Sequence, residues 1–398
     1  MLYTEEEIFD YVEQEDVKFI RLAFCDAFGK QKNISIMPEE LSRAFSDGIS
    51  FDASAVRGFG SEVKSDLLLF PVPSTFNVLP WRPSRGKVVR MFCDIRRPDG
   101  APFEKDSRKI LKDAVKKAAE KGLTVYFGSE FEFYLFKTDE NGDNTKVPFD
   151  NAGYMDVAPD DKGENIRREI CLTLSDMGIR PESSHHEEGP GQNEIDFRYS
   201  DAVSAADNAM NFITVVKAAA LNNGLFADFS PKPLKNESGN GMHINISVKS
   251  TDGSDQSVHF LAGILNRVRE MTAFLNPCED SYKRLGEKKA PKYITWSHEN
   301  RSQLVRIPAA KGEYKRIELR SPDPTANPYI AFALLIYAGL EGIEKGLEIP
   351  EPVNENLFTA PESVTKSLSL LPQSLEEAKK IARESEFIST YLPKGFAE

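Results

Sequence analysis

Cysteine is scarce in this sequence, and its few copies lie far apart. The chain of 398 residues has four cysteines, Cys25, Cys93, Cys171 and Cys278, and no two of them form a CxxC pair. This spacing argues against a disulfide framework and against a zinc site built from thiolates. We expect reduced, mostly buried thiols in a cytoplasmic protein.

An excess of positive charge and a long apolar run are also lacking. The chain has 50 Lys and Arg against 62 Asp and Glu, a formal net charge of −12. A nucleic-acid-binding protein usually has a basic face, so no nucleic-acid partner is expected. No apolar run approaches the roughly 20 residues that a membrane span needs, and the first residues, MLYTEEEIFDYVEQ, lack the pattern of a secretory signal. We therefore expect no membrane association.

The remaining composition is that of a globular protein with two domains. Hydrophobic residues make up 40% of the chain and charged residues 28%, and the length exceeds that of one ordinary domain. The polar, turn-rich segment 98–108 separates a β-rich part from a part in which strands alternate with helices. The sequence predicts an α+β protein with a small domain over residues 1–103 and a large domain over residues 104–398.

Four predicted strands of the large domain carry polar side chains on one face and apolar side chains on the other. Residues i and i+2 of a strand point the same way. The polar faces hold Glu130 and Glu132; Glu194 and Asp196; His243, Asn245 and Ser247; and Arg316, Glu318 and Arg320.

A single strand with one polar face can be explained by contact of that face with solvent, as in many antiparallel sheets. Four together favour a binding site, because carboxylates that share a face repel one another unless a cation lies between them. Carboxylate oxygens with one imidazole suit Mg²⁺ or Mn²⁺. Arginines nearby bind phosphoryl oxygens and substrate carboxylates.

Eight blocks of the chain, taken in order, resemble those of type I glutamine synthetases. They are FDASAVRGFG (51–60), LPWRP (79–83), MFCDIRRPDGAPFEKDSR (91–108), GSEFEFYLF (128–136), HHEEGPGQNEIDF (185–197), SGNGMHINIS (238–247), NRSQLVRIP (300–308) and KRIELRSPDPTANPY (315–329). The resemblance implies a β-grasp-like N-terminal domain and a catalytic domain with a curved antiparallel sheet, of the kind shared with guanidino kinases. It also implies an ATP-dependent ligase that forms glutamine from glutamate and ammonia through γ-glutamyl phosphate.

The same resemblance implies the ligands of the cofactor, two to three Mg²⁺ or Mn²⁺ ions in each site. One ion would be held by Glu132, Glu187 and Glu194, and a second by Glu130, His243 and Glu318. Glu187 precedes the turn Gly189-Pro190-Gly191, so its side chain can fold back toward Glu194.

Substrate contacts are implied in the same way. Those for glutamate are Glu132, Ser238, Gly239, His243, Arg284 and Arg320, and those for the ATP co-substrate are Tyr199, Ser247, Arg306 and Arg316. Arg301 and Arg306 would hold the transferring phosphate, and Asp52 and Asp66 would bind and deprotonate ammonium. Since the family builds its sites between subunits, Asp52 would come from a neighbour in a homo-oligomer, a dodecamer.

Several residues depart from the family pattern on the amino-acid and amine side. Ser238 replaces an asparagine, Asn245 replaces a second histidine, and Ala53 and Ala55 replace a glycine and a serine. In the shortened flap RLGEKKAP, Lys289 replaces the glutamate that shields the intermediate and attracts ammonium, so we expect Lys289 to point away and Glu287 to take over. Phe358 replaces the tyrosine that some relatives adenylylate.

These departures leave two alternatives to glutamine formation. One is a ligase that joins glutamate to an organic amine, and the other is a catalytically weak member of the family with a binding or structural role. A phosphagen-type kinase would share a related catalytic domain, but the block around Asp52 and the N-terminal β domain argue against it.

Overall fold

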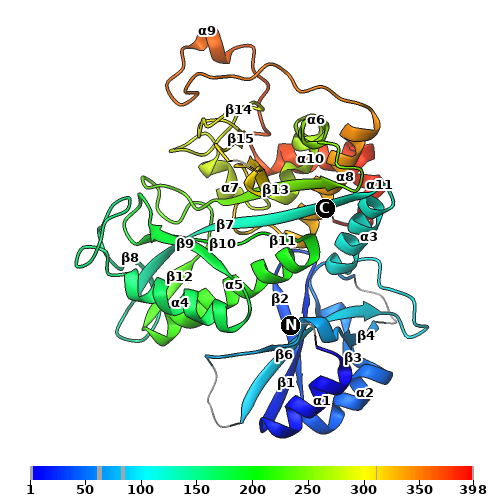
Figure 1. Cartoon of the computed structure of the whole chain (residues 1–398). Helices are drawn as coiled ribbons and strands as arrows, with labels where there is room; N and C mark the ends of the chain where they lie inside the picture. The colour runs from blue at the N-terminus through cyan, green and yellow to red at the C-terminus, as the bar shows by residue number, and fades with distance from the viewer. Residues whose placement is uncertain (1–2, 61–64, 82–85, 311, 397–398) are drawn as a thin grey trace.

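The computed structural model describes residues 3–60, 65–81, 86–310 and 312–396. A six-stranded sheet forms the N-terminal part, at the bottom of Figure 1. Its strands run in the order β2 (Gln31–Ile36), β1 (Val17–Cys25), β6 (Lys87–Arg96), β4 (Asp66–Pro71) and β3 (Ile49–Asp52), and β5 (Asn77–Val78) pairs with β6. Strands β1 and β6 are parallel, and the other pairs are antiparallel.

Short helices surround this sheet. They are α1 (Glu5–Gln14), α2 (Leu41–Ser46) and the 3₁₀ turns η1 (Pro38–Glu40), η2 (Ala53–Ala55) and η3 (Pro73–Thr75). Helix α1 begins with a capping box, in which Thr4 and Glu7 bond each other's backbone amides. Its buried residues Ile8 and Val12 pack into the same core as Leu22 and Met91. This part confirms the predicted β-grasp arrangement.

A ten-stranded, mostly antiparallel sheet forms the larger part. Its strands run in the order β14 (Trp296–His298), β15 (Val305–Ile307), β16 (Ile317–Leu319), β13 (Met242–Ser250), β7 (Leu123–Thr138), β10 (Gln192–Phe197) and β9 (Pro181–His186). The remaining strands, β8 (Asn144–Pro148), β11 (Ser200–Asp201) and β12 (Leu225–Asp228), pair with β7. The long strand β7 therefore organises the whole sheet.

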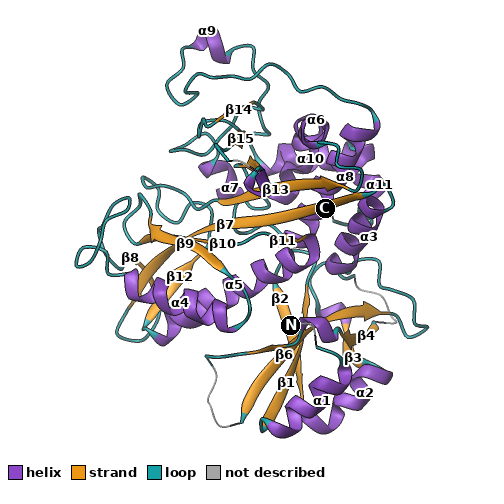
Figure 2. Cartoon of the chain, in the orientation of Figure 1, coloured by secondary structure: helices purple, strands orange, loops and turns teal. Residues whose placement is uncertain are grey.

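Helices cover this sheet, with α4 and α5 at the lower left and α6, α8, α10 and α11 at the upper right of Figure 2. The helices are α3 (Ser107–Ala119), α4 (Glu164–Asp176), α5 (Ala202–Asn222), α6 (Ser257–Leu275), α7 (Glu279–Arg284), η4 (Gly312–Tyr314), α8 (Pro328–Glu344), α9 (Glu362–Thr365), α10 (Leu375–Glu384) and α11 (Glu386–Tyr391). Helix α8 is apolar almost all round and is buried, as its sequence predicts. None of the helices within the described ranges combines the length and apolar character that crossing a membrane requires.

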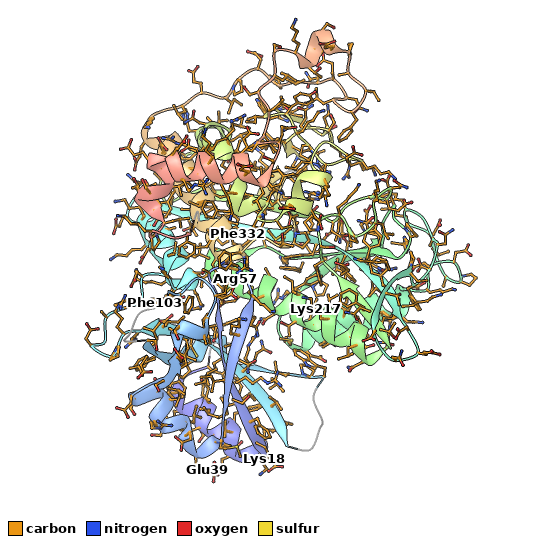
Figure 3. All side chains as sticks on the ribbon, turned by 180° about the vertical axis from the view of Figure 1, so that it is seen from behind. Lys18, Glu39, Arg57, Phe103, Lys217 and Phe332 are labelled. Atoms are coloured by element: carbon orange, nitrogen blue, oxygen red, sulfur yellow. The ribbon has the colours of Figure 1, made fainter. Side chains whose placement is uncertain are left out.

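The helix side of the sheet is the apolar side. Phe332 of α8 lies in the middle of the large part, whereas Lys18 and Glu39 lie at the far end of the small part (Figure 3). The rings of Phe127 and Phe332 stack with centroids 4.3 Å apart. Because alternate residues of β7 point to opposite faces, Phe131 and Phe133 enter this core while Glu130 and Glu132 point away from it.

A tight contact joins the two parts. Asn327, the N-cap of α8, donates from Nδ2 to the carbonyl oxygens of Asp26 and Ala27 in the β1–β2 turn. Gly29 in that turn has a φ of +81°, and a Cβ there would lie 2.9 Å from the Cα of Asn327. The turn predicted at residues 26–29 is thus confirmed, and only glycine fits its last position.

Candidate active site

The polar face of the large sheet is built by the register of its central strands. On β7, Glu130 lies opposite His243 of β13 on one side and opposite Asp196 of β10 on the other. Glu132 lies opposite Glu194 of β10 in the same way. The predicted common face of these strands is therefore confirmed.

Strands β16 and β15, beyond β13, extend the same face. Glu318 of β16 lies opposite Asn245 of β13 and opposite Arg306 of β15. Glu318 is fully buried, and its carboxylate is bonded by Arg306 and Arg320. A 2.7 Å hydrogen bond from Arg306 Nε to Glu318 Oε2 holds the guanidinium group of Arg306 beside the polar face of the sheet.

Four groups of side chains among the described residues of this face have the spacing of metal ligands, and one of them consists of Glu130, Glu194 and Asp196. In the group of Glu130, His243 and Glu318, the ligand atoms all lie within 4.8 Å of one another, and the same holds for Glu132, Glu194 and His243. The imidazole links the two groups, since its Nδ1 is 3.2 Å from Glu130 Oε2 and its Nε2 is 3.9 Å from Glu132 Oε1. The fourth group consists of His185, Glu187 and Glu194.

The electrostatics of this cluster favour a cation. Burial, with the charges of Asp196 and Glu132, raises the pKa of Glu194 well above its usual value. Burial and the charge of Glu130 likewise raise the pKa of Asp196. Burial alone would also raise the pKa of Glu130, but hydrogen bonds from His243 and Asn245 lower it. A divalent ion with oxygen ligands would offset this crowding of carboxylates, so the residues fit Mg²⁺ or Mn²⁺.

A cavity of about 520 Å³ opens over the cluster. The predicted residues that line it are Glu130, Glu132, Glu187, Glu194, Gly239, His243, Arg284, Arg301, Arg306, Arg316 and Arg320. Arg284 is buried and donates to the carbonyl oxygens of Ser321, at 2.8 Å, and Arg320, at 3.3 Å. These bonds fix its orientation, and the cavity thus has carboxylates on one wall and guanidinium groups on another.

A smaller pocket of about 80 Å³ adjoins this cavity beyond Glu130 and Arg316, which line both. Tyr199 and Ser247, which the sequence predicts to contact the nucleotide, both line the small pocket. Arg316 Nε donates to Asn245 Oδ1 at 2.8 Å, so the asparagine that replaces the second histidine orients this arginine.

Six predicted residues do not line the catalytic cavity of their own chain: Tyr199 and Ser247, which line the small pocket, the buried Glu318, and Asp52, Asp66 and Ser238. Asp52 and Asp66 lie opposite each other in the β3–β4 pair of the N-terminal part, and both are exposed. Hydrogen bonds from Ser54 lower the pKa of Asp52. Ser238 is nearly buried, and its Oγ donates over 3.4 Å to Glu188 Oε2, outside the cavity lining.

The flap between α7 and β14 is tied to neighbouring loops by its lysines. Lys289 Nζ lies 2.6 Å from Glu188 Oε1 and 5.1 Å from the centroid of the Tyr154 ring. Lys288 lies 3.5 Å from Glu237. Lys289 lines the catalytic cavity, whereas Glu287 lines a neighbouring pocket of about 370 Å³. The expectation that Lys289 points away and Glu287 takes over is therefore wrong, because the ion pair with Glu188 holds Lys289 at the cavity.

Sequence reasoning missed His185, whose Nε2 is 2.9 Å from Glu187 Oε1 and 3.9 Å from Glu194 Oε1. Burial disfavours the charge of Glu187, but the hydrogen bond from His185 lowers its pKa. His185 lies two residues before Glu187, so the rule that places residues i and i+2 on one face was the available signal.

A second, buried group supports the loop that carries Glu187. His186 Nε2 lies 2.9 Å from Asp150 Oδ1, and its Nδ1 lies 2.7 Å from the carbonyl oxygen of Glu187. Asp150 also accepts from the backbone N–H of Gly191 at 2.9 Å. No sequence pattern pointed to Asp150, because it lies 36 residues before His186.

The fold and this site are those of an ATP-dependent carbon–nitrogen ligase. The family model of the glutamine synthetase β-grasp domain matches residues 16–98, and that of the glutamine synthetase catalytic domain matches residues 104–398. With these matches, the chain belongs to the glutamine synthetase family.

Full-length relatives agree with this assignment. The glutamine synthetase of Clostridium saccharobutylicum is 45% identical over 98% of this chain and 91% of its own, and that of Methanosarcina mazei is 44% identical over 98% and 90%. Among solved structures, GmaS in complex with ADP has a TM-score of 0.89 at 29% identity, over 98% of this chain and 93% of that one. The Plasmodium falciparum glutamine synthetase has a TM-score of 0.86 at 23% identity, over 99% and 94%, and supports the fold alone.

The activity that follows is the ATP-dependent formation of glutamine from glutamate and ammonia, with Mg²⁺ or Mn²⁺ as the cofactor. The predictions of the family, the fold class and the reaction are thereby confirmed.

Proposed function

We propose that the 520 Å³ cavity binds glutamate together with the γ-phosphate of ATP, and that the nucleoside end of ATP occupies the pocket at Tyr199 and Ser247. The observation that carries this proposal is the convergence of carboxylates, His243 and guanidinium groups on one cavity. A cavity with these walls suits two anionic substrates, because the arginines can bind them and the carboxylates would hold divalent cations that offset the substrate charge.

The metal ligands in this proposal are Glu130, Glu132, Glu187, Glu194, His243 and Glu318, as the sequence predicts. Divalent ions bound there would polarise phosphoryl oxygens and neutralise the charge that develops on them. Glu318 has a second task, because it orients the guanidinium groups of Arg306 and Arg320.

Arginines hold glutamate and the γ-phosphate of ATP in position. Arg284, held by two backbone carbonyls, takes the α-carboxylate of glutamate, with Gly239 beside it. Arg301 and Arg306 bind the γ-phosphate, and Arg320 stabilises the reacting end of glutamate. The γ-carboxylate oxygen attacks the γ-phosphorus and ADP leaves, which gives an acyl phosphate. Ammonia then attacks the acyl carbon and phosphate leaves.

The remaining part of the site comes from a neighbouring subunit. Asp52 and Asp66 are exposed, adjacent in register and outside the cavity of their own chain, which supports a role in a second chain. There they would bind ammonium and take up its proton. We propose a homo-oligomer, a dodecamer, with a domain boundary after residue 103 and a cytoplasmic location consistent with four free cysteines.

Assembly has a direct test. Light scattering gives the mass of the particle, and subunit mixing tests sharing of the site. An Asp52→Asn chain and an Arg306→Ala chain, each inactive alone, should recover activity when they are co-assembled, because some sites then receive both intact residues. A fully active monomer, or mixed particles without recovered activity, would contradict the proposal.

Ammonia is the nucleophile favoured by the flap. The ion pair with Glu188 offsets the positive charge of Lys289, so the flap does not repel ammonium as an unpaired lysine would. A larger organic ammonium would extend into the adjoining 370 Å³ pocket, where it would meet the charge of Lys292. The organic-amine alternative is tested by phosphate release with glutamate and a panel of amines, in which ammonium should give the highest kcat/KM.

A further inference from the structure

A buried polar group lies beside the turn that carries Glu187, and the proposed mechanism uses none of its side chains. Every member is at most 8% exposed, and none of them lines the catalytic cavity. Strands β9 and β10, helix α4 and the loop between β8 and α4 contribute one or two members each. The members are Asp150, Asp161, Arg167, His186 and Asn193.

One oxygen of Asp150 joins the two ends of the turn that carries Glu187. Asp150 Oδ1 lies 2.9 Å from Nε2 of His186, which directly precedes Glu187. The same oxygen accepts from the backbone N–H of Gly191, at the end of the turn, at 2.9 Å. The other ring nitrogen of His186, Nδ1, lies 2.7 Å from the carbonyl oxygen of Glu187. Both ring nitrogens of His186 therefore face an acceptor, which fixes the orientation of the ring.

Asp150 and His186 also hold the loop between β8 and α4. Asp150 Oδ2 accepts from the backbone N–H of Lys162 at 3.1 Å, so this carboxylate connects the start of the loop to its end. Within the loop, the backbone N–H of Met155 donates to the His186 carbonyl oxygen at 2.9 Å. Tyr154 and Met155 line the catalytic cavity. The bonds of Asp150 and His186 thus reach two walls of that cavity.

A second set of hydrogen bonds holds the same turn from helix α4. Asn193 Nδ2 donates to the Gly191 carbonyl oxygen at 2.9 Å. Arg167 of α4 donates from Nη1 to Asn193 Oδ1 at 2.6 Å and forms an ion pair with Asp161. Because Gly191 is bonded at both its N–H and its carbonyl oxygen, the end of the turn has little freedom to move.

This rigidity matters for Glu187, because the charges around it favour a displacement. Its carboxylate shares a group of metal-ligand spacing with His185 and Glu194. Two carboxylates repel each other until a cation lies between them. On a loosely held turn Glu187 would move away from Glu194, and binding of the ion would have to reorder the turn. A turn that is fixed beforehand avoids this cost, and residues that orient metal ligands typically change metal affinity by about 10- to 100-fold.

We propose that Asp150 is a positioning residue for Glu187, which acts through His186 and Gly191 and sets the affinity of one of the two divalent ions. This inference rests on the proposed role of Glu187 as a metal ligand. The other ion would be held by the group that contains Glu130, and among the described residues no side chain of that group is hydrogen-bonded to Asp150. The effect of Asp150 should therefore fall on one ion only.

Electron paramagnetic resonance of free Mn²⁺, added to the full-length chain without substrates, tests this proposal. Glu187→Gln and Glu130→Gln assign the two classes of bound ion, since each variant should weaken its own class. Asp150→Ala should weaken the class assigned to Glu187 by about 10- to 100-fold and leave the other class within about threefold of the wild type.

The conservative variant Asp150→Asn should give an intermediate affinity for the same ion. Its amide oxygen can still accept from His186 and Gly191, but its amide nitrogen cannot accept from the N–H of Lys162. If Asp150→Ala does not fold, Asp150→Asn decides the question by the same comparison of the two classes.

Asp106→Ala is the matched control for the loss of a buried carboxylate. Asp106 is 3% exposed and accepts from the backbone N–H groups of Arg108, at 3.0 Å, and Ile95, at 3.1 Å. It caps α3 and does not line the catalytic cavity. Urea unfolding should show a loss of stability in both Asp106→Ala and Asp150→Ala, whereas only Asp150→Ala should change the affinity for Mn²⁺.

Two results would overturn the proposal. One is an unchanged affinity of the class assigned to Glu187 in Asp150→Ala. The other is an equal fall in both classes, as a general loosening of the fold would give. Unchanged Mn²⁺ binding in Glu187→Gln would instead overturn the proposed ligand set, and this inference with it.

Discussion

Lys289 and Glu188 form an ion pair at the edge of the catalytic cavity, with Nζ and Oε1 2.6 Å apart. This pair joins the flap to the loop that follows Glu187, a proposed metal ligand. It explains how a lysine can stand where the family resemblance places a glutamate, because its charge is neutralised within the chain.

The first prediction concerns this pair. Glu188→Gln leaves Lys289 without a compensating charge beside the position of ammonium, and a unit charge about 4 Å away costs up to about 4 kcal/mol at an effective dielectric near 20. Solvent screening reduces this value, so the KM for ammonium should rise at least tenfold. Lys289→Met should not raise it, and the double variant should return to within about threefold of the wild type. Glu287→Ala is the control, since its side chain lines another pocket. An unchanged KM for ammonium in Glu188→Gln would show that the ion pair of Lys289 and Glu188 has no role in ammonium binding.

The second prediction concerns the metals. Glu130→Gln removes one ligand charge from the group with His243 and Glu318, so Mn²⁺ should bind at least about 100-fold more weakly and activity should fall with it. Electron paramagnetic resonance of free Mn²⁺ measures the affinity without turnover. Glu140→Gln, in the exposed turn that follows the same strand, should behave as the wild type. Equal Mn²⁺ affinities in the three proteins would exclude Glu130 as a ligand.

The third prediction concerns the turn after Glu187. A Cβ on Gly189 would lie 1.9 Å from the hydroxyl oxygen of Tyr134, which is fully buried and bonded to the Ser238 carbonyl oxygen. Gly189→Ala should therefore displace the turn and weaken Mn²⁺ binding by about 10- to 100-fold. A Cβ on Gly153 would lie 3.5 Å from Asp156 Oδ2, which is an ordinary contact, so Gly153→Ala should bind Mn²⁺ normally. If Gly189→Ala binds Mn²⁺ normally, the turn does not position Glu187.

The polar face that Glu130 and Glu132 share on β7 could be predicted from the sequence pattern. The side chains that this face meets on neighbouring strands could not. Alternation along β7 places Glu130 and Glu132 together. Their contact with His243 depends on the pairing of β7 with β13, 113 residues further along the chain, and local patterns do not encode such a register. The ligand sets and arginine roles therefore came from the family resemblance, not from periodicity.

Loop geometry explains what the sequence could not show. Lys289 and Glu188 lie in different loops, 101 residues apart, and the flap backbone has positive φ at Gly286, Lys288 and Lys289. No short-range rule predicts which carboxylate such a loop will meet. Asp150 is a comparable case, because an acidic residue in a loop gives no sign that it will bond to a histidine 36 residues further along the chain.

The fourth prediction concerns pH and stability. Glu341 of α8 accepts from Arg267 of α6, at 2.7 Å to Nε and 2.6 Å to Nη2, and hydrogen bonds from Arg267 lower the pKa of Glu341 to about 2. The pKa of Glu341 in the folded state is thus below its ordinary value of 4.5, so this stabilisation is present above about pH 4.5 and is lost as the pH falls toward 2.

Urea unfolding at pH 7 and at pH 3 measures this effect. Glu341→Gln should lower the free energy of unfolding by about 1–2 kcal/mol at pH 7, and the difference from the wild type should shrink at pH 3. Glu344→Gln breaks an exposed ion pair to Lys121 and should cost less than about 0.5 kcal/mol at either pH. A cost for Glu341→Gln that does not depend on pH would show that the charge of Glu341 is not the source.

The most direct measurement is the stoichiometry of the overall reaction. The purified chain, with ATP, glutamate and Mg²⁺, should release phosphate only when ammonium is added, and mass spectrometry should find one glutamine for each phosphate. Arg306→Ala should lower this rate by at least about 100-fold, because Arg306 lies beside Glu318 and is the residue that we propose binds the γ-phosphate. Phosphate release that needs an organic amine and ignores ammonium, or ATP hydrolysis without an amide product, would contradict the assignment.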